Sequence, residues 1–239
     1  MKPLLVFDLF GTLVAEFDKT AVLLLLRRVY ARCAEDPLIP AIGKGLEFHH
    51  FAEAVERMYE THYRAAARTS ALSPDVLVAI HALLTEVAGE EPSIDAVEAF
   101  LTHYAESEQL VGLAEAERVL QTLRERGYEM ALLSNVFFPG WIYTGRLIEL
   151  GLAPWLKPMV FSADLPFMKP NIAIFNFVAQ MVDRPREELV MVGDRPDLDI
   201  AGATSAGWRS VLIGDAALPG AEQATWIVPD LPSILDLFP

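Results

Sequence analysis

The sequence predicts an α/β protein built on a doubly wound parallel sheet, with an all-helical domain inserted into it. Short apolar runs recur along the chain and mostly stop at small or polar residues, which is typical of strands buried on both faces of a parallel sheet. Segments with helical spacing separate the later runs, and a long helical stretch separates the first run from the second. Strands alternating with helices favour a doubly wound sheet over a sandwich or a helical bundle.

Five apolar runs are expected to be strands of this sheet. They are Leu4–Phe7, Met130–Leu133, Met159–Phe161, Leu189–Val192 and Ser210–Ile213. Four helices are expected around the later strands, and three of them stop at a glycine, the residue that most often ends a helix. These helices span Ala114–Arg126, Trp141–Leu150, Ile172–Val182 and Asp199–Ala206.

The long gap between the first and second strands predicts a separate helical domain. Its helices are expected at Thr20–Arg32, Glu47–Arg68, Pro74–Val87 and Ser93–Glu106, the third with Ser73 as its N-cap. We therefore expect a core domain made of residues 1–15 and 111–239, and a helical cap domain made of residues 16–110. Ligands of open α/β sheets bind beyond the carboxyl ends of the strands, so an insertion leaving that edge would cover the binding crevice.

The composition restricts the partners and the compartment. The 239 residues include 19 Lys and Arg against 33 Asp and Glu, which gives a net charge of −14. Nucleic acids and anionic membranes require a basic footprint, so neither is an expected partner. The single Cys33 excludes a disulfide within the chain, and no apolar run is long enough to span a membrane, so we expect a cytoplasmic protein. A mean hydropathy of +0.30 indicates spare apolar surface, which favours a homodimer.

Polar residues end or follow the predicted strands at one edge of the sheet. They are Asp8 at the first strand, Ser134 and Asn135 at the second, Lys169 after the third, and Asp194 and Asp199 at and after the fourth. Such ends meet in a doubly wound sheet, so one cleft would hold several carboxylates and one ammonium group. Carboxylates that close together need a balancing cation, which indicates Mg²⁺ bound with waters and the phosphate of a small anionic substrate.

Four short motifs resemble those of the haloacid dehalogenase-like hydrolase superfamily and occur in the same order. They are Asp8-x-x-Gly11-Thr12-Leu13 after an apolar run, Ser134-Asn135, Lys169-Pro170, and Gly193-Asp194-x4-Asp199-x2-Gly202-Ala203. The motifs themselves are short, but their spacing accounts for most of the expected core. The helical insertion also lies where the helical C1 cap of that family lies.

The resemblance implies roles for the residues that would handle the substrate. Asp8 would be the nucleophile and would form a covalent intermediate that water later hydrolyses. Thr12 and Ser134 would hold the transferred group through their hydroxyls, with Asn135 assisting. Lys169 would neutralise charge on the nucleophile and on the substrate, which matters when one anion attacks another.

The resemblance also implies a metal site. Mg²⁺ would be bound by Asp8, by Asp194 and by the backbone carbonyl of Phe10. Asp199 would either orient Lys169 or complete the metal shell.

Phe10 departs from the pattern of the phosphatases in this superfamily. They usually carry a second aspartate at this position, which protonates the leaving oxygen, and such acid–base assistance is typically worth about 10²–10⁴ in rate. Glu16 and Asp18, just past the first strand, are candidates to replace it. The 2-haloacid dehalogenase branch carries an aromatic tyrosine there, and its reaction needs neither an acid nor a metal. That branch, however, lacks the Gly-Asp pair that this chain has at Gly193-Asp194.

We therefore expect an enzyme, a Mg²⁺-dependent phosphatase that acts on a small phosphorylated metabolite. Two alternatives stay open. One is a 2-haloacid dehalogenase-type hydrolase, which Phe10 favours. The other is a weakly catalytic or non-catalytic protein of the same fold that binds a phosphorylated ligand or a partner through its cap.

Overall fold

The structure, a computed structural model, describes residues 2–43, 45–69 and 72–239 and contains one parallel sheet in those ranges. The strand order is β3-β2-β1-β4-β5-β6, so the predicted α/β class is confirmed. The strands are β1 (Leu4–Phe7), β2 (Met130–Ser134), β3 (Met159–Phe161), β4 (Leu189–Gly193), β5 (Arg209–Ile213) and β6 (Trp226–Val228). The sixth strand was not expected, because it is short and partly exposed and only its pairing with β5 identifies it as a strand.

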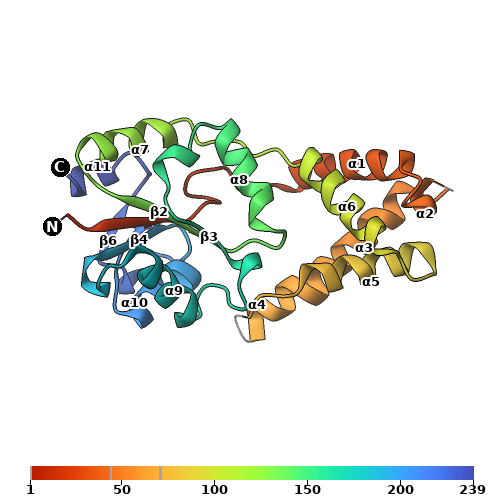
Figure 1. Cartoon of the computed structure of the whole chain (residues 1–239). Coiled ribbons are helices and arrows are strands. Elements are labelled where there is room, and N and C mark those ends of the chain that lie inside the picture. The colour runs from red at the N-terminus through yellow and green to blue at the C-terminus, as the bar shows by residue number, and fades with distance from the viewer. Residues whose placement is uncertain (1, 44, 70–71) are drawn as a thin grey trace. The chain divides into compact units, whose positions relative to one another are not determined.

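Helices cover both faces of the sheet, which explains why its strands are mostly apolar. Figure 1 shows α7, α8 and α11 on one side of the sheet and α9 and α10 on the other. Their bounds are α7 (Ala116–Glu125), α8 (Gly140–Glu149), α9 (Ile172–Val182), α10 (Ala201–Ala206) and α11 (Ile234–Leu237). The central strand β1 is at most 2% exposed at every residue, because it pairs with β2 on one side and β4 on the other.

The strand order reverses at β1, and this reversal determines where a site can form. From β1 the chain moves outward through β2 to β3, and then crosses back to β4 and moves outward to β5 and β6. The register pairs Phe7 with Val192, so the carboxyl ends of β1 and β4 lie beside each other. In open α/β sheets, ligands bind at this kind of reversal point.

Short helical turns occupy several of the connections in the sheet-containing part. They are η2 (Ala153–Trp155), η3 (Ser162–Asp164), η4 (Arg186–Glu188), η5 (Pro196–Ile200) and η6 (Ala221–Gln223). The first turn of the helix expected at Asp199–Ala206 is not α-helical in the structure. Asp199 and Ile200 belong to η5, a π-helical turn, and the α-helix begins only at Ala201.

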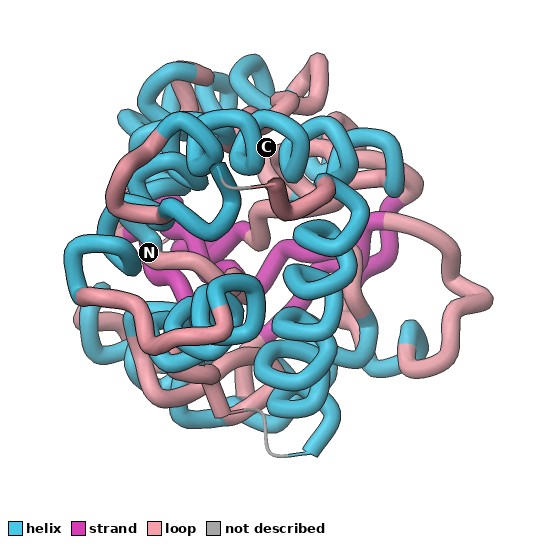
Figure 2. Tube along the Cα trace, turned by 90° about the vertical axis from the view of Figure 1, so that its right-hand side faces the viewer, coloured by secondary structure: helices cyan, strands magenta, loops and turns pink. Residues whose placement is uncertain are grey.

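The described chain falls into two compact units. Unit 1 comprises the residues up to Glu16 together with Leu110–Pro239, and unit 2 comprises Phe17–Gln109. All of the strands named above belong to unit 1, and Figure 2 shows strands in magenta and helices in cyan along the trace. The assignment of these parts as a catalytic core and a cap domain stays a prediction.

Unit 2 is built from packed helices, as the spacing of its apolar residues predicts. They are α1 (Lys19–Glu35), α2 (Pro40–Gly43), α3 (Phe48–Met58), η1 (Tyr59–Arg64), α4 (Ala65–Thr69), α5 (Val76–Ala88) and α6 (Ile94–Ser107). Phe51 of α3 is fully buried, and its ring centroid lies 5.6 Å from that of Tyr30 and 6.5 Å from that of Phe100. These aromatic contacts join α1, α3 and α6 around one core.

Two details of unit 2 differ from the expectation. The helix expected at Glu47–Arg68 has a π-helical middle, η1, between α3 and α4. The N-cap of α5 is Asp75 rather than Ser73, because the Asp75 carboxylate accepts hydrogen bonds from the backbone N–H groups of Leu77 and Val78. A carboxylate at this position also interacts favourably with the helix dipole.

The two chain segments that lead into and out of unit 2 are paired with each other inside unit 1. The backbone N–H of Ala15 donates to the carbonyl of Val111 at 2.8 Å, and that of Leu113 donates to Leu13 at 3.0 Å. Val14 and Gly112 form an antiparallel bridge between these two bonds. The long insertion therefore begins and ends at one short antiparallel ladder.

The described helices include none that is long and apolar enough to cross a membrane. The cytoplasmic location and the homodimer expected from composition stay predictions.

Cys33 is fully buried among the α1 residues that face the core of unit 2, and burial raises the pKa of its thiol to about 12. Only the thiolate reacts with alkylating reagents, so the native protein should react with iodoacetamide at pH 8 at least about a hundredfold more slowly than the urea-unfolded chain. Mass spectrometry of the alkylated fraction over time would measure this. Equal rates in native and unfolded protein would contradict the burial of this thiol.

Candidate active site

A cluster of charged side chains lies at the carboxyl edge of the sheet, where the strand order reverses. Asp8 directly follows β1 and Asp194 directly follows β4, and the backbone N–H of Asp8 donates to the carbonyl of Val192 at 2.8 Å. Carboxylate oxygens of Asp8, Asp194 and Asp199 lie within 4.8 Å of one another. The sheet topology therefore brings together three acids that are far apart in the sequence.

Lys169 supplies the positive charge of this cluster. Its ammonium donates to Asp8 Oδ1 at 2.7 Å and to Asp199 Oδ1 at 2.6 Å, and its side chain is only 2% exposed. Burial would lower the pKa of Lys169, but the two carboxylates outweigh it and raise the pKa above the ordinary value. The two carboxylates therefore favour the charged form of Lys169. Removing one partner of such a buried pair typically costs about 3–5 kcal/mol of folding free energy.

Both carboxylate oxygens of Asp199 have partners within unit 1. Oδ1 accepts from the Lys169 ammonium, and Oδ2 accepts from the backbone N–H of Arg195 at 3.0 Å. Its complete burial raises the pKa of the Asp199 carboxyl, while the Lys169 ammonium acts in the opposite direction. This geometry favours the first of the two roles expected for Asp199, which is to orient the lysine.

Asp194 differs from Asp199 because part of its carboxylate is uncommitted. Its Oδ1 is buried and has no hydrogen-bond partner among the described residues. Burial, followed by the nearby carboxylates of Asp8 and Glu16, raises the pKa of Asp194 to about 6. A buried carboxylate oxygen without a partner, beside a second carboxylate, fits a hard divalent cation such as Mg²⁺, which prefers oxygen ligands.

Two motif glycines allow the backbone to approach these carboxylates. Gly11 has a φ of +75°, and a Cβ at that position would overlap the carboxylate of Asp194. A Cβ at Gly193 would overlap the carboxylate of Asp199. Any larger residue at either position would displace an acid of the cluster, which gives both glycines a steric role in the site.

Two hydroxyls in this part of the sheet edge are buried without hydrogen-bond partners among the described residues. Ser134 ends β2, and Thr12 lies in the turn that follows Asp8. Buried hydroxyls normally find a partner, so these two are available as donors to a bound group. No hydrogen bond joins either hydroxyl to the charged cluster in the described structure.

Asn135 is bound to the backbone of Lys169. Its Nδ2 donates to the Lys169 carbonyl at 2.8 Å, and its Oδ1 accepts from the Lys169 N–H at 2.7 Å. No local pattern predicts this pairing, because the two residues are separated by 34 positions and neither lies in a helix or strand.

Phe10 is half-buried against an aromatic group that the sequence did not indicate. Its ring meets that of Tyr143 edge-on at 6.0 Å, and Tyr143 stacks on Phe161 at 5.8 Å. Tyr143 comes from α8 and Phe161 ends β3. A residue two positions after Asp8 therefore contributes an apolar wall in place of a second carboxyl group. Metal binding by the Phe10 backbone carbonyl stays a prediction.

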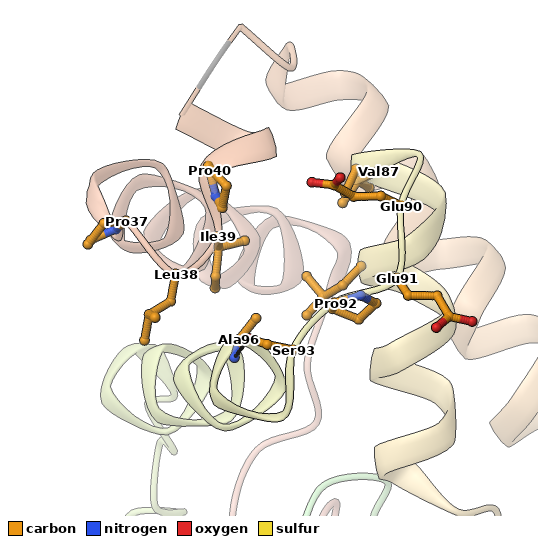
Figure 3. Close-up of a pocket in the computed structure, with 12 residues that line it drawn as sticks. Pro37, Leu38, Ile39, Pro40, Val87, Glu90, Glu91, Pro92, Ser93 and Ala96 are labelled. Atoms are coloured by element: carbon orange, nitrogen blue, oxygen red, sulfur yellow. Dashed lines mark hydrogen bonds between the residues drawn. The ribbon is translucent and has the colours of Figure 1, made fainter.

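A pocket in unit 2 is separate from this cluster and carries no comparable chemistry. It has a volume of about 300 Å³ and is lined mainly by apolar side chains and prolines from the segments around 37–40 and 84–96 (Figure 3). Its only acidic side chains, Glu90 and Glu91, are exposed. We assign no chemistry to it.

This chain is similar in sequence to known proteins. Residues 3–207 match the family model of haloacid dehalogenase-like hydrolases. A glyceraldehyde 3-phosphate phosphatase of Methanothermobacter thermautotrophicus is 32% identical over 59% of this chain and 62% of its own length. A ribulose-1,5-bisphosphate 5-phosphatase of Halopiger xanaduensis is 30% identical over 70% of each chain. The alignment thus spans less than two thirds of the first relative.

The fold also resembles solved structures over its full length. The putative hydrolase YfnB from Bacillus subtilis, described as bound to magnesium, aligns with a TM-score of 0.66 and 20% identity, over 100% of this chain and 99% of its own. At this identity the likeness establishes the fold alone.

Asp194 should destabilise the metal-free protein at neutral pH. Its folded pKa of about 6 lies above the unfolded value near 3.9, so the carboxyl favours folding below about pH 4 and loses that contribution as pH rises through 6. In EDTA, Asp194→Asn should therefore raise the thermal midpoint at pH 8, by about 2–4 °C per kcal/mol of repulsion removed, and the gain should vanish towards pH 4. Differential scanning fluorimetry across pH 4–8 measures this.

Asp197→Asn is the matched control, because Asp197 lies in the same segment but is exposed and paired with Arg195. An exposed pair contributes little, so this variant should leave the midpoint within about 1 °C. Added Mg²⁺ should raise the midpoint of the wild type and of Asp197→Asn but not that of Asp194→Asn. A pH-independent effect of Asp194→Asn would contradict the assignment.

Proposed function

Since the chain belongs to the haloacid dehalogenase-like hydrolases, we propose that it is a Mg²⁺-dependent phosphatase for a small phosphorylated metabolite, with Asp8 as its nucleophile. The observation that carries this proposal is the uncommitted Asp194 carboxylate beside Asp8. A site that binds an anion without a metal gains nothing from an extra carboxylate, whereas a metal-assisted phosphatase requires one. The two curated relatives described above, both named phosphatases, support the same activity.

In this proposal Asp8 attacks phosphorus. Lys169 holds its Oδ1, which fixes the carboxylate and leaves Oδ2 for bond formation or for the metal. In the first step, an Asp8 oxygen forms a bond to phosphorus while the bond to the ester oxygen breaks, and that oxygen leaves with the bonding electron pair as an anion, which takes any proton it needs from water. In the second step, water attacks the phosphorus of the aspartyl phosphate, inorganic phosphate leaves, and the Asp8 carboxylate is restored.

The other residues bind and orient the phosphoryl group. Lys169 places a buried positive charge where an anionic nucleophile meets an anionic substrate. Asp199 holds the lysine through its Oδ1 and is itself held by a backbone N–H. The hydroxyls of Thr12 and Ser134, which lack protein partners, would donate hydrogen bonds to phosphoryl oxygens.

Mg²⁺ would be held by Asp8, by Asp194 and by the backbone carbonyl of Phe10. When bound, it would supply charge neutralisation on the phosphoryl oxygens. Asp199 is the weakest candidate ligand of the three acids, because both of its oxygens already accept hydrogen bonds.

Phe10 restricts which esters can be hydrolysed well. The phenyl ring cannot donate a proton to the departing oxygen, so that oxygen must leave as a poor base. Acyl and aryl phosphates meet this condition better than alkyl phosphates.

The second candidate function is a 2-haloacid dehalogenase, and the Phe10 side chain is the observation that favours it. Displacement of halide by the Asp8 carboxylate needs no leaving-group acid. Against it, Asp194 would place a third carboxylate near a substrate that is itself an anion, with Lys169 as the balancing charge of the cluster. The phosphatase is therefore the stronger proposal.

The direct test is hydrolysis of p-nitrophenyl phosphate and acetyl phosphate with and without Mg²⁺. We expect turnover that EDTA abolishes and Mg²⁺ restores, and that Asp8→Asn removes because an amide is not a nucleophile in this step. Asp197→Asn, which neutralises an exposed acid of the same sheet edge, should retain activity.

Two results would overturn the proposal in different directions. Metal-independent halide release from 2-chloropropionate that depends on Asp8 would establish the dehalogenase. No turnover of either class of substrate, combined with saturable binding of inorganic phosphate, would establish a weakly catalytic or non-catalytic protein.

Phe10→Asp tests the missing acid. A carboxyl group at this position should raise kcat on an alkyl ester such as glycerol phosphate by about 10²–10⁴. It should change the hydrolysis of acetyl phosphate little, because that leaving group needs no proton. Phe10→Leu is the control for loss of the contact with Tyr143 and should give no gain. Equal wild-type rates on alkyl and acyl phosphates would show that another residue already supplies the proton.

A further inference from the structure

We infer that Asn135 is a positioning residue, whose side-chain amide holds the backbone of Lys169 and thereby places the lysine ammonium against Asp8. This role differs from the one that the family resemblance implies for Asn135, which is to assist Thr12 and Ser134 in holding the transferred group. The inference rests on the proposed function for its kinetic test, but a second test below is independent of it.

The geometry is a closed two-bond pair between one side chain and one backbone residue. The Asn135 amide donates to the Lys169 carbonyl at 2.8 Å and accepts from the Lys169 N–H at 2.7 Å. A backbone N–H can only donate and a carbonyl can only accept, so this pairing also fixes which amide atom is oxygen. The amide oxygen and one amide N–H are thus committed to Lys169.

Lys169 needs such a support because no regular element fixes its backbone. It lies in a turn after η3 and before α9, outside any strand or helix. The two hydrogen bonds from Asn135 match the pair that a neighbouring strand donates and accepts in an antiparallel sheet. They satisfy both the N–H and the carbonyl of Lys169, which is buried. Asn135 therefore supplies the backbone hydrogen bonds that a neighbouring strand would otherwise supply to Lys169.

The turn is also supported from α10, through Gly202. A Cβ at Gly202 would overlap the ring of Phe175 and would come within 3.2 Å of the Pro170 Cα. Since Pro170 follows Lys169 directly, the lysine backbone is held by Asn135 on one side while its neighbour packs against α10. Loss of the Asn135 amide should release one of these supports without unfolding the turn.

Placement matters because the ammonium contacts two carboxylates at close distance. The lysine stem has several rotatable bonds, so a shift of its Cα would be transmitted to the 2.7 Å contact with Asp8. Misplacement of a catalytic group by about 1 Å can lower the rate about a hundredfold. The effect should fall on the chemical step rather than on substrate binding.

The first test compares Asn135→Ala with Asn171→Ala. Asn171 is a matched control in the same turn, since its amide oxygen only caps α9 by accepting from the Ala173 N–H. Asn135→Ala should lower kcat for acetyl phosphate about 10–100-fold, as for other supports of catalytic groups, with KM within about threefold. Asn171→Ala should lower the thermal midpoint but leave kcat within about twofold. A large rise in KM with kcat retained would show direct substrate contact and overturn the inference.

The second test is a double-mutant cycle with Lys169→Gln, whose amide can still bind a carboxylate. If Asn135 acts only through the lysine, Asn135→Ala should lower kcat by less than about threefold in the Lys169→Gln background. A loss equal to that in the wild-type background would mean an independent role and would overturn the inference.

The third test does not depend on activity. In protein labelled with ¹⁵N-lysine, the Lys169 ammonium should give a slowly exchanging NMR signal, because it is buried between two carboxylates. Asn135→Ala should broaden or shift this signal, and Asn171→Ala should leave it unchanged. An unchanged signal in Asn135→Ala overturns the inference, even if the wild type hydrolyses no phosphate ester and the proposed function has failed.

Discussion

The pairing of the Lys169 ammonium with Asp8 and Asp199 is the interaction on which the rest of unit 1 depends. A charge that is 2% exposed requires partners within hydrogen-bond distance, because burial without them is prohibitively unfavourable. The partners come from the end of β1 and from the turn after β4, which are adjacent only because the strand order reverses there. The sheet topology, the backbone of the lysine turn and the motif glycines can all be understood as conditions for this contact.

The same cluster carries more negative than positive charge. Three carboxylates surround one ammonium, and the raised pKa of Asp194 shows that the ionised form of this acid is disfavoured in the protein alone. A protein selected only for stability would not retain such a residue, so its presence is a mark of function. At position 10, by contrast, an expected acidic group is absent, and the Phe10 ring makes an aromatic contact with Tyr143 instead. The site thus has carboxylates that fit a divalent cation, but at position 10 it has no group that can transfer a proton.

Much of this arrangement could be predicted from the sequence because its signals are local. The apolar runs at Leu4–Phe7 and Leu189–Val192 predict buried strands directly, and the topology then places Asp8 and Asp194 at one edge. Features set by tertiary contacts could not be predicted. The pairing of Asn135 with Lys169 depends on where a turn passes, and β6 is recognisable as a strand only through its pairing with β5. The choice between the two roles of Asp199 likewise required knowing that a backbone N–H occupies its second oxygen.

The short ladder between residues 13–15 and 111–113 has a consequence for how such a chain can diversify. Because Ala15 and Val111 are already joined by a hydrogen bond, unit 2 is connected to unit 1 in the way that a loop is connected to the two strands of a hairpin. The entropic cost of closing a loop grows only slowly with its length. Segments of very different length can therefore be inserted between these two ends. The hydrogen-bonded frame of unit 1 can then stay constant while evolution, or a protein engineer, exchanges the inserted segment.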